Sequence, residues 1–562
     1  MRTNRIGRML AFCFALLIAF SAVRCSVVSA SAAALPGDTW TEGSITATLD
    51  TKEQEAEKVT VNAYKLVSVH TAQLDGTNPA VFQPSMPEYT WESGIAGWVR
   101  TYYPDYIGAA ADGGNPADDS VQEVFSTGNE DSSKDISAAV AANFYAEIEA
   151  GIMGGAIQLS PVSLTVSGKT ASKSGLTMGV YLVTATGGTA VYRPTVAIIT
   201  PVEIGGSWTI AENAQVVLKS SPVSLKKTIT AVNAASDNVV SGDGKHAVAG
   251  IGDTVSYKLE VDVPEYPSQS VSRAFIIKDT LPEWLTLTQG TIKVKMSDGT
   301  ELQNLSDRIR VEGQVLTIDL TQAADKTIQN PIDGKRKLLV TYDAKLNAKA
   351  TLGEAGNVST ASLTYSNNPY NEASAKIVDD IATVYTFGIE VTKVQKGTTN
   401  PLSGAQFELK DAGSIPIKFS DGYVKNADGA ATPTTGTDGK LTLKGLAPGT
   451  YKLKETKAPA GYVLSAAETE ITIADTNFNG IPDSKEQPTT DTTTTQTTTT
   501  QTTEKDKDNG LVSITVENTK GFTLPRTGGI GTVLFSMIGI VLMGSGVLLV
   551  AVFLRKRFGK SR

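Results

Sequence analysis

The feature that most restricts how this chain can fold is an uncharged apolar run near its C-terminal end. The run covers residues 529–554, and a basic tail that begins with Arg555-Lys556-Arg557 follows it. A helix of that length can cross a hydrocarbon core of about 30 Å, and a basic flank favours the cytoplasmic side. The sequence therefore predicts one transmembrane helix over residues 529–554.

The N-terminal end carries the three parts of a secretory signal peptide. Three arginines among the first eight residues are followed by an apolar stretch over residues 9–20 and by Ala30-Ser31-Ala32, a small-residue cleavage site. We expect residues 1–32 to be removed and the exported chain to begin at or near Ala33.

Composition excludes several classes of function. Cys13 and Cys25 are the only cysteines and lie in the segment expected to be removed, and His70 and His246 are the only histidines. The mature chain therefore has no disulfide, no thiolate or imidazole catalysis and no Cys/His metal site. A net charge of -8 argues against a nucleic-acid partner, since no basic stripe is available for phosphates.

A five-residue motif precedes the apolar run: Leu524, Pro525, Arg526, Thr527 and Gly528. This motif, the apolar run and the basic tail, in that order, resemble the cell-wall sorting signal of Gram-positive surface proteins. The resemblance implies that a sortase cleaves after Thr527 and passes its acyl group to an amine. Residues 524–562 would then insert in the membrane only transiently, and the secreted chain would end in the cell wall, on peptidoglycan, or in a fimbrium.

Between the terminal segments there is room for about three domains of common size. We expect them to cover residues 33–219, 220–385 and 386–521. Short alternating segments separated by Gly, Asp and Pro turns predict strands throughout. In the first domain one amphipathic helix is expected. Asp135 is its N-cap and Gly151 its stop, and its apolar positions are Ile136, Val140, Phe144 and Ile148.

A lysine lies at the expected junction of the first two domains. After Trp208, a β-run ends at Lys219, and a new strand that contains Lys226-Lys227-Thr228 follows. This layout resembles the pilin motif of sortase-assembled pili, although that motif usually has Tyr-Pro before the lysine and Asn after it. The resemblance implies that Lys219 accepts the threonine acyl group of the next subunit, with Lys226 as the main alternative.

The second domain contains the runs Gly-Asp-Thr-Val-x-Tyr from Gly252, Asp-Thr-Leu-Pro from Asp279 and Leu-Thr-Tyr-Ser-Asn-Asn-Pro at residues 363–369. These runs are similar to the fimbrial domain that forms an internal Lys-Asn isopeptide bond. The resemblance implies Lys227 as the nucleophile, Asp279 as the catalytic carboxyl and Asn357 as the electrophile. Asn367 and Asn368 remain alternatives to Asn357.

The chemistry explains these residue types. A lysine buried among apolar side chains loses its proton, because desolvation disfavours the charge, and only the neutral amine can attack an amide. A carboxyl group buried beside it is kept protonated and can polarise the amide carbonyl and relay protons. Proximity on adjacent strands makes the step unimolecular. Such a reaction is a single-turnover self-modification rather than enzyme activity.

The third domain contains Tyr-Lys-Leu-Lys-Glu-Thr-Lys-Ala-Pro-Ala-Gly-Tyr at residues 451–462. This run resembles the glutamate-containing box of CnaB-type domains of collagen adhesins. The resemblance implies an isopeptide bond between Lys393 and Asn518 with Glu455 as the acid/base, and a fold of tandem Ig-like β-sandwiches.

A loop within the third domain has the ligand spacing of an EF-hand calcium loop, with Gly480 at position 6. The candidate ligands are Asp475, Asn477, Asn479, Ile481, Asp483 and Glu486. A turn-rich solvated loop explains the same residues, so both interpretations remain open, and no other cofactor is expected. The threonine-rich tract at residues 489–503 is expected to be a disordered spacer and a possible O-glycosylation site.

Taken together, the resemblances imply the backbone subunit of a sortase-assembled Gram-positive pilus. Its implied partners are a class C pilus sortase, a housekeeping sortase, identical subunits, peptidoglycan and minor or tip pilins, with a host surface ligand that the sequence does not identify. The alternative is a monomeric cell-wall-anchored adhesin that binds its ligand through the first domain. A wall-anchored enzyme is least favoured, because no catalytic set converges.

Overall fold

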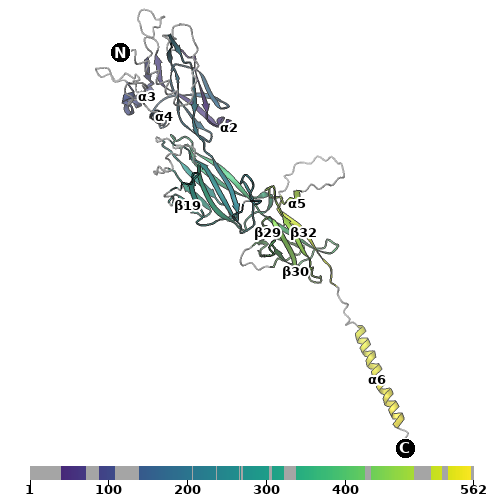
Figure 1. The fold of residues 1–562 in the computed structure, drawn as a ribbon. Helices are drawn as coiled ribbons and strands as arrows, with labels where there is room; N and C mark the ends of the chain where they lie inside the picture. The colour runs from purple at the N-terminus through teal and green to yellow at the C-terminus, as the bar shows by residue number, and fades with distance from the viewer. Residues whose placement is uncertain are drawn as a thin grey trace, which may run out of the picture. The chain divides into compact units, whose positions relative to one another are not determined.

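The structure is a computed structural model that describes residues 40–70, 88–107, 138–204, 207–321, 337–424, 432–486, 508–521 and 530–558, except positions 236, 265, 267–269, 301, 303–304, 306 and 372. The expected signal peptide, the motif at residues 524–528 and the threonine-rich tract lie outside the described residues. The described residues are mainly β, as expected, and their two longest helices are α4 and α6 (Figure 1).

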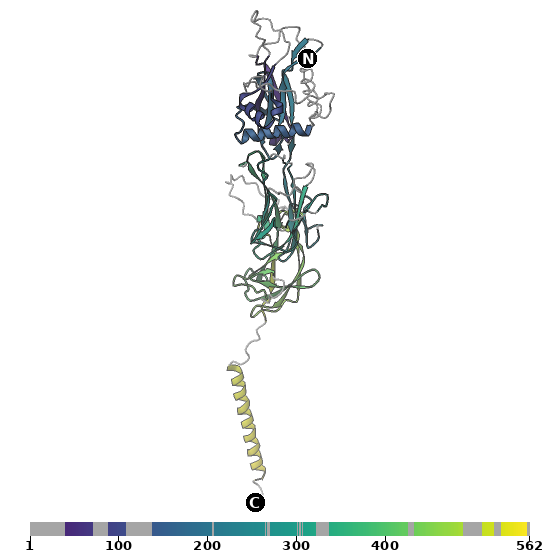
Figure 2. The ribbon, with the colours of Figure 1, turned by 90° about the vertical axis from the view of Figure 1, so that its left-hand side faces the viewer.

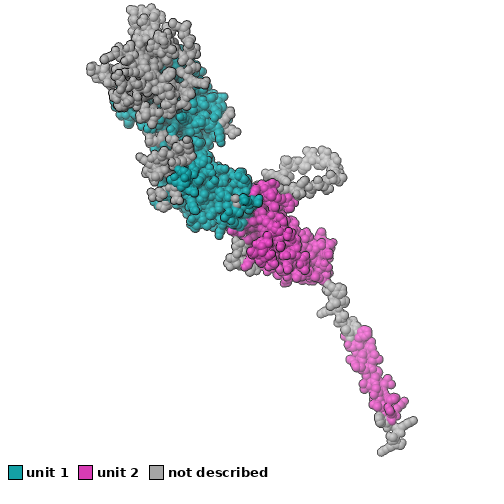
Figure 3. All heavy atoms as spheres, viewed as in Figure 1, with its two compact units in different colours: residues 1–249, 253–351, 356–385 teal, residues 250–252, 352–355, 386–562 magenta. Residues whose placement is uncertain are grey.

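The chain divides into two compact units (Figure 3). Unit 1 comprises residues 1–249, 253–351 and 356–385, and unit 2 comprises residues 250–252, 352–355 and 386–562. Within unit 1 we call residues 40–221 the N-terminal region and the rest, from residue 222, the middle region. Residues 386–521 of unit 2 are the C-terminal region. The three domain boundaries expected from the sequence stay a prediction.

The N-terminal region is built on an eight-stranded sheet with the order β11-β1-β5-β4-β2-β6-β8, in which β3 pairs with β2. Alternating residues of β2 serve two apolar clusters: Val61 and Ala63 lie in one, and Leu66 lies in the other, beneath the helices. The strands of this region are β1 Gly43–Leu49, β2 Val59–His70, β3 Glu88–Trp91, β4 Pro161–Ser167, β5 Thr170–Leu176, β6 Gly179–Gly187, β7 Val191–Tyr192, β8 Thr195–Ile199, β9 Pro201–Ile204, β10 Ser207–Ile210, β11 Asn213–Leu218 and β12 Ser220–Ser221.

The helices of the N-terminal region are α2 Glu53–Ala56, α3 Ser93–Tyr102, the 3-10 turn η1 Pro104–Tyr106 and α4 Ala138–Met153. Helix α4 lies across the strands (Figure 2) and buries Phe144 and Ile148, two of the expected apolar positions. The expected single helix is wrong, because α3 also packs on this face, and the expected stop at Gly151 is wrong too. Gly151 instead leaves room for Ile157, and the left-handed Gly155 (φ 76°) follows the helix end.

The middle region is a sandwich of two sheets, with the orders β13-β15-β21-β17, where β18 also pairs with β21, and β14-β23-β22-β16-β20-β19. One apolar cluster fills the space between them. Its elements are β13 Leu225–Val232, β14 His246–Val248, β15 Thr254–Asp262, β16 Phe275–Thr280, β17 Leu285–Leu287, β18 Lys293–Met296, β19 Ile309–Glu312, β20 Val315–Asp319, β21 Lys337–Leu346, β22 Asn357–Ser366 and β23 Ala375–Tyr385.

The C-terminal region also has two sheets, with the orders β27-β28-β29-β24-β32 and β26-β25-β30-β31. Its first strand β24 pairs in parallel with its last strand β32. The elements of unit 2 are the 3-10 turn η3 Gly353–Ala355, β24 Phe387–Gln395, β25 Gln406–Lys410, β26 Pro416–Ile417, β27 Phe419–Ser420, β28 Tyr423–Val424, β29 Lys440–Leu446, β30 Gly449–Lys457, β31 Glu468–Ile473, α5 Asp483–Glu486, β32 Leu511–Asn518 and α6 Ile530–Phe558.

Helix α6 corresponds to the expected transmembrane segment. Residues 533–557 are long and apolar enough to cross a membrane, and they are not buried against the rest of the chain. Arg555, Lys556 and Arg557 of the basic tail lie in its last turn, where cations interact favourably with the helix dipole.

Candidate functional site

The C-terminal region brings together the three residues assigned to its isopeptide chemistry. Lys393 on β24 and Asn518 on β32 belong to one sheet, and Glu455 on β30 belongs to the facing sheet. All three are buried. Alternation along each strand turns these side chains inward, so the first and last strands and the opposite sheet meet at one point of the core.

The contacts of this site are direct. The Lys393 Nζ contacts the Asn518 Oδ1 and lies 3.3 Å from the Glu455 Oε1. The Asn518 Nδ2 donates a hydrogen bond of 2.9 Å to the same Glu455 oxygen, and the Ser465 backbone N–H donates to the other oxygen at 2.9 Å. The carboxyl group is thus held between the amine and the leaving nitrogen of the amide.

The surroundings of Lys393 favour its neutral form. Burial lowers the pKa of Lys393, and this effect exceeds the opposing attraction of Glu455. The Phe407 ring lies 5.9 Å from the amine. A lysine of lowered pKa that touches a carboxamide is suited to act as a nucleophile.

The middle region holds a second buried lysine, with a different set of partners. The Lys227 Nζ on β13 bonds to both oxygens of Asp279 on β16, at 2.9 and 2.7 Å, and to the Ser359 Oγ on β22 at 2.7 Å. It also lies 3.1 Å from the Tyr342 hydroxyl, which donates to the Asp279 Oδ2 at 2.6 Å. Lys227, Asp279 and Ser359 each have no exposed surface.

Burial lowers the pKa of Lys227, and the attraction of Asp279 opposes that effect. Burial also raises the pKa of Tyr342 far above its ordinary range, with the nearby Asp279 adding to the shift, so Tyr342 remains a hydrogen-bond donor. The sequence analysis did not single out Tyr342 or Ser359. Both occupy inward positions of alternating strands, but this alternation alone does not distinguish them from other core residues.

The structure does not bring Asn357, the expected electrophile, into contact with Lys227. The Asn357 Nδ2 donates to the backbone carbonyls of Thr351 at 2.7 Å and Val384 at 3.0 Å, and its Oδ1 accepts from the Thr351 N–H at 2.8 Å. The side chain is therefore fully engaged in tying the start of β22 to neighbouring backbone. Lys227 instead contacts Ser359, two residues further along the same strand.

The alternative asparagines, Asn367 and Asn368, are also not at Lys227. Asn367 contacts the loop between β6 and β7: it accepts from the Gly187 N–H at 3.0 Å and donates to the Ala190 carbonyl at 2.8 Å. The Asn368 Oδ1 accepts from the Tyr370 N–H at 3.0 Å and shapes the turn after β22.

Asn367 is part of a contact between the N-terminal and middle regions that the sequence analysis missed. The Tyr365 hydroxyl donates to the Thr189 carbonyl at 3.0 Å, and the Lys376 Nζ donates to the Gly188 carbonyl at 3.2 Å. We call Tyr365, Asn367 and Lys376, with the loop at residues 187–190, the interregion clasp. The Tyr-Ser-Asn-Asn-Pro run thus serves docking within unit 1.

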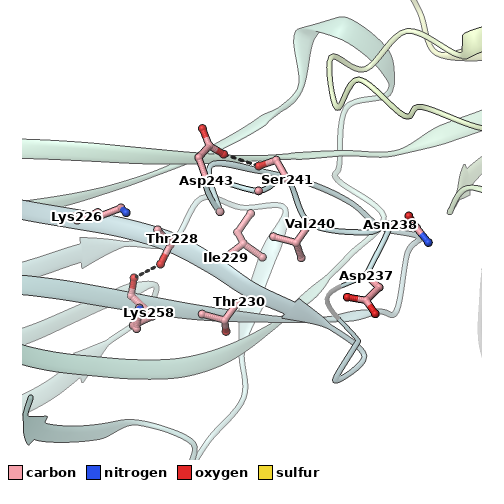
Figure 4. A pocket seen from close by; sticks show the side chains of 12 residues that line it. Lys226, Thr228, Ile229, Thr230, Asp237, Asn238, Val240, Ser241, Asp243 and Lys258 are labelled. Atoms are coloured by element: carbon pink, nitrogen blue, oxygen red, sulfur yellow. Dashed lines mark hydrogen bonds between the residues drawn. The ribbon is translucent and has the colours of Figure 1, made fainter.

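The two candidate acceptor lysines both have exposed side chains. Lys219 directly follows β11, and its backbone carbonyl accepts from the Arg193 N–H at 3.0 Å. Lys226, on β13, lines a groove of about 740 Å³ whose wall also includes Lys258 and Asp243 (Figure 4). Both positions leave the amine near the surface, so accessibility does not distinguish them.

The calcium-type loop is held by its own hydrogen bonds. Buried Asp475 accepts from the backbone N–H groups of Asn479 at 3.1 Å and Gly480 at 2.9 Å, and Asp483 accepts from the Thr476 N–H at 3.0 Å. Among the residues that the structure describes, no three His, Cys, Asp or Glu side chains gather as a metal site. Calcium binding stays a prediction.

Comparison with known proteins gives four findings. The family of the LPXTG cell wall anchor motif matches residues 516–557, and the SpaA family, described as a prealbumin-like fold domain, matches residues 387–488. The trypsin-resistant surface T6 protein of Streptococcus pyogenes is 26% identical over 390 residues, which cover 58% of this chain and 68% of that protein. The structure of the T6 backbone pilin of serotype M6 Streptococcus pyogenes matches with a TM-score of 0.57 and 19% identity, covering 86% of this chain and 99% of that one.

These matches agree with the features found in the chain itself. The anchor match includes the Leu-Pro-Arg-Thr-Gly motif and α6, and the prealbumin-like match includes Lys393 and Glu455. The likeness in fold to the T6 backbone pilin, whose structure is described as modular and three-domain, extends over 86% of this chain. Together, the findings show that the chain carries a prealbumin-like domain and an LPXTG cell-wall anchor and that it is similar to a streptococcal surface protein.

Proposed function

We propose that the chain is the backbone subunit of a covalent pilus, in which a pilus sortase joins Thr527 of one subunit to Lys219 of the next. The observation that carries this proposal is the anchor motif, which supplies an acyl donor on a chain that also presents an exposed lysine at a strand end. In this reaction the Thr527–Gly528 peptide bond breaks and an amide forms with the Lys219 Nζ. A housekeeping sortase would attach the last subunit to peptidoglycan.

The test is an immunoblot of cell-wall extracts boiled in detergent, from cells that make the native chain or Lys219→Ala. We expect a high-mass ladder for the native chain and monomer for the variant. Lys226→Ala is the matched control and keeps the ladder. A ladder lost only in Lys226→Ala moves the acceptor to the groove lysine, whereas no ladder from the native chain, with its pilus sortase present, favours the monomeric adhesin.

The second part of the proposal is an internal isopeptide bond in the C-terminal region. The neutral Lys393 amine attacks the Asn518 Cγ, a C–N bond forms, and the Nδ2 leaves as ammonia. Glu455 contacts both nitrogens and is placed to move the proton from one to the other. Contact between the reacting groups in a closed core supplies the proximity that such aminolysis needs.

This bond would join neighbouring strands at the two ends of one region. Lys393 and Asn518 are 125 residues apart in sequence, yet β24 and β32 are adjacent and parallel. A tensile force that enters through β24 and leaves through β32 would pass through the covalent bond. The rest of the sheet would then carry little load.

A further inference from the structure

The middle region has a nucleophile and a carboxyl group but no described amide at the point of attack. Lys227 contacts Asp279, Tyr342 and Ser359, and no carboxamide is among its hydrogen-bond partners in the described part of the chain. We propose that Ser359 occupies the electrophile position of an incomplete isopeptide site. Unlike the C-terminal region, the middle region would then keep a free lysine in its core.

The distance from Lys227 to Ser359 carries this assignment. The serine Oγ and the asparagine Cγ are both the first atom beyond Cβ, so Ser359 Oγ marks where the carbonyl carbon of an asparagine would lie. That atom is 2.7 Å from the Lys227 Nζ. Reacting atoms in a productive arrangement are about 3–3.5 Å apart, so residue 359 is the position from which an amide would meet the amine. A hydroxyl group has no acyl carbon, so no amide bond can form there.

The position of Asp279 supports the same conclusion. Strands β16 and β22 pair with Asp279 opposite Ala361, so Ser359 is a diagonal neighbour of Asp279 on the inward face. An asparagine at residue 359 would have its carboxamide between Lys227 and Asp279. This is the relation that Asn518 has to Lys393 and Glu455 in the C-terminal region.

Other acyl groups near Lys227 are less suited to attack. Asn357, two residues before Ser359, is held by three hydrogen bonds to the backbone of Thr351 and Val384. Asp279 accepts hydrogen bonds from Lys227 and from Tyr342, and an unactivated carboxyl group beside an amine forms an ion pair rather than an amide. We therefore expect Lys227 and Asp279 to remain a buried ion pair.

The first experiment is a tryptic peptide map of the full chain, purified in detergent from cells without sortase. Trypsin cleaves after a free lysine and not after one whose amine is acylated. We expect a peptide that begins at Thr228, which reports a free Lys227, and no peptide that begins at Val394. A missing Thr228 peptide, with a branched peptide heavier by the partner's mass less ammonia or water, would overturn the inference.

The two lysines are read separately, because this inference rests on the chemistry proposed for the C-terminal region. If the Val394 peptide is present, the proposed bond at Lys393 is wrong. The expectation that an asparagine introduced at residue 359 would react with Lys227 is then overturned as well. The Thr228 peptide still reports independently whether the middle region is crosslinked.

The second experiment completes the site with Ser359→Asn. The Lys227 amine would attack the carbonyl carbon of the carboxamide introduced at residue 359, ammonia would leave, and Asp279 would move the proton. We expect the intact mass to fall by one further ammonia, about 17 Da, relative to the mass calculated for the variant, with loss of the Thr228 peptide. Thr360→Asn, on the exposed face of the same strand, is the matched control and shows no further loss.

A third variant keeps the result interpretable. Ser359→Asn combined with Asp279→Ala retains the new amide but lacks the carboxyl group, and it is expected to lose no second ammonia. If Ser359→Asn folds, as shown by retained cooperative unfolding, and still yields the Thr228 peptide, then residue 359 is not the electrophile position. If it does not fold, the peptide map of the native chain decides the inference alone.

Discussion

The middle and C-terminal regions each bury a lysine inside a β-sandwich, but they surround it with different partners. In the C-terminal region Lys393 touches an amide and a carboxyl group, so its desolvation can end in a neutral covalent bond. In the middle region Lys227 touches a carboxylate and two hydroxyl groups, so its desolvation is offset only by hydrogen bonds and charge. The residue opposite the amine, and not the buried lysine itself, decides which outcome is available.

The comparison also separates two meanings of stability. A buried ion pair is weak evidence for stability, because desolvation offsets most of the attraction, although removing one partner is costly. A crosslink lowers the conformational entropy of the unfolded chain, so it stabilises the fold by making the unfolded state less favourable. We therefore expect the two sites to respond differently to substitution and to pH.

The largest expected effect is in Glu455→Gln, which removes the acid/base and should leave Lys393 and Asn518 unlinked. In the chain-entropy treatment, a crosslink that closes a loop of about 100 residues contributes roughly 4–5 kcal/mol. We expect a loss of that order in the unfolding free energy of the C-terminal region, measured by chemical denaturation, and an intact mass higher by one ammonia. Glu468→Gln, an exposed change on the neighbouring strand, is the control. A variant that still forms the bond would show that Glu455 is dispensable.

The next effect tests the ion pair of the middle region. Asp279→Ala leaves the Lys227 amine in the core without its charged partner. Breaking a buried pair lowers the free energy of unfolding by about 3–5 kcal/mol. Replacing both partners, as in Lys227→Met with Asp279→Leu, should cost much less, because no charge is left unpaired. The measurement is the denaturant midpoint of the middle region in each variant. Equal losses in the single and double variants would contradict the ion-pair description.

The smallest expected effect is on pH dependence. Burial lowers the pKa of Lys227 in the folded state, so above that pKa the unfolded chain binds more protons than the folded chain. The middle region should therefore gain stability as pH rises toward the ordinary lysine pKa of about 10.4, by at most about 1.4 kcal/mol per pH unit. Denaturant midpoints measured as the pH rises toward about 10 would show this slope.

Matched variants connect the slope to the two lysines. Lys227→Met should remove it from the middle region. In the crosslinked C-terminal region Lys393 no longer titrates, so no such slope is expected there, whereas Glu455→Gln should restore one. A slope in the native C-terminal region would indicate that its lysine is free.

Sequence reasoning anticipated the two sites unequally, for a physical reason. Glu455 lies in a twelve-residue run whose turns and strand residues fix its register, and the first-strand lysines follow from strand alternation. Asn357 and Ser359 both satisfy that alternation on β22, since each faces inward. Only the packing of β13 against β22, which sequence patterns do not specify, shows that residue 359 and not residue 357 meets the lysine.

The same limit applies to the helices. Helix α3 contains two glycines, Gly94 and Gly97, and begins without a side-chain cap, so it lacks the local signals of a helix start. It forms because Ile95 and Val99 pack against the sheet. Gly151 has the residue type of a helix stop, but it lies within the helix, where its lack of a side chain makes room for Ile157.

The interregion clasp has a consequence for how this protein can vary. Tyr365, Asn367 and Lys376 bond to main-chain atoms of residues 187–190, so these bonds do not depend on the identity of the Thr189 side chain. Gly187 is different: at φ 103° a Cβ would lie 2.3 Å from the Lys58 carbonyl oxygen. Residue 189 can therefore be exchanged without loosening the contact between the two regions, whereas a side chain at residue 187 would clash with the backbone of Lys58.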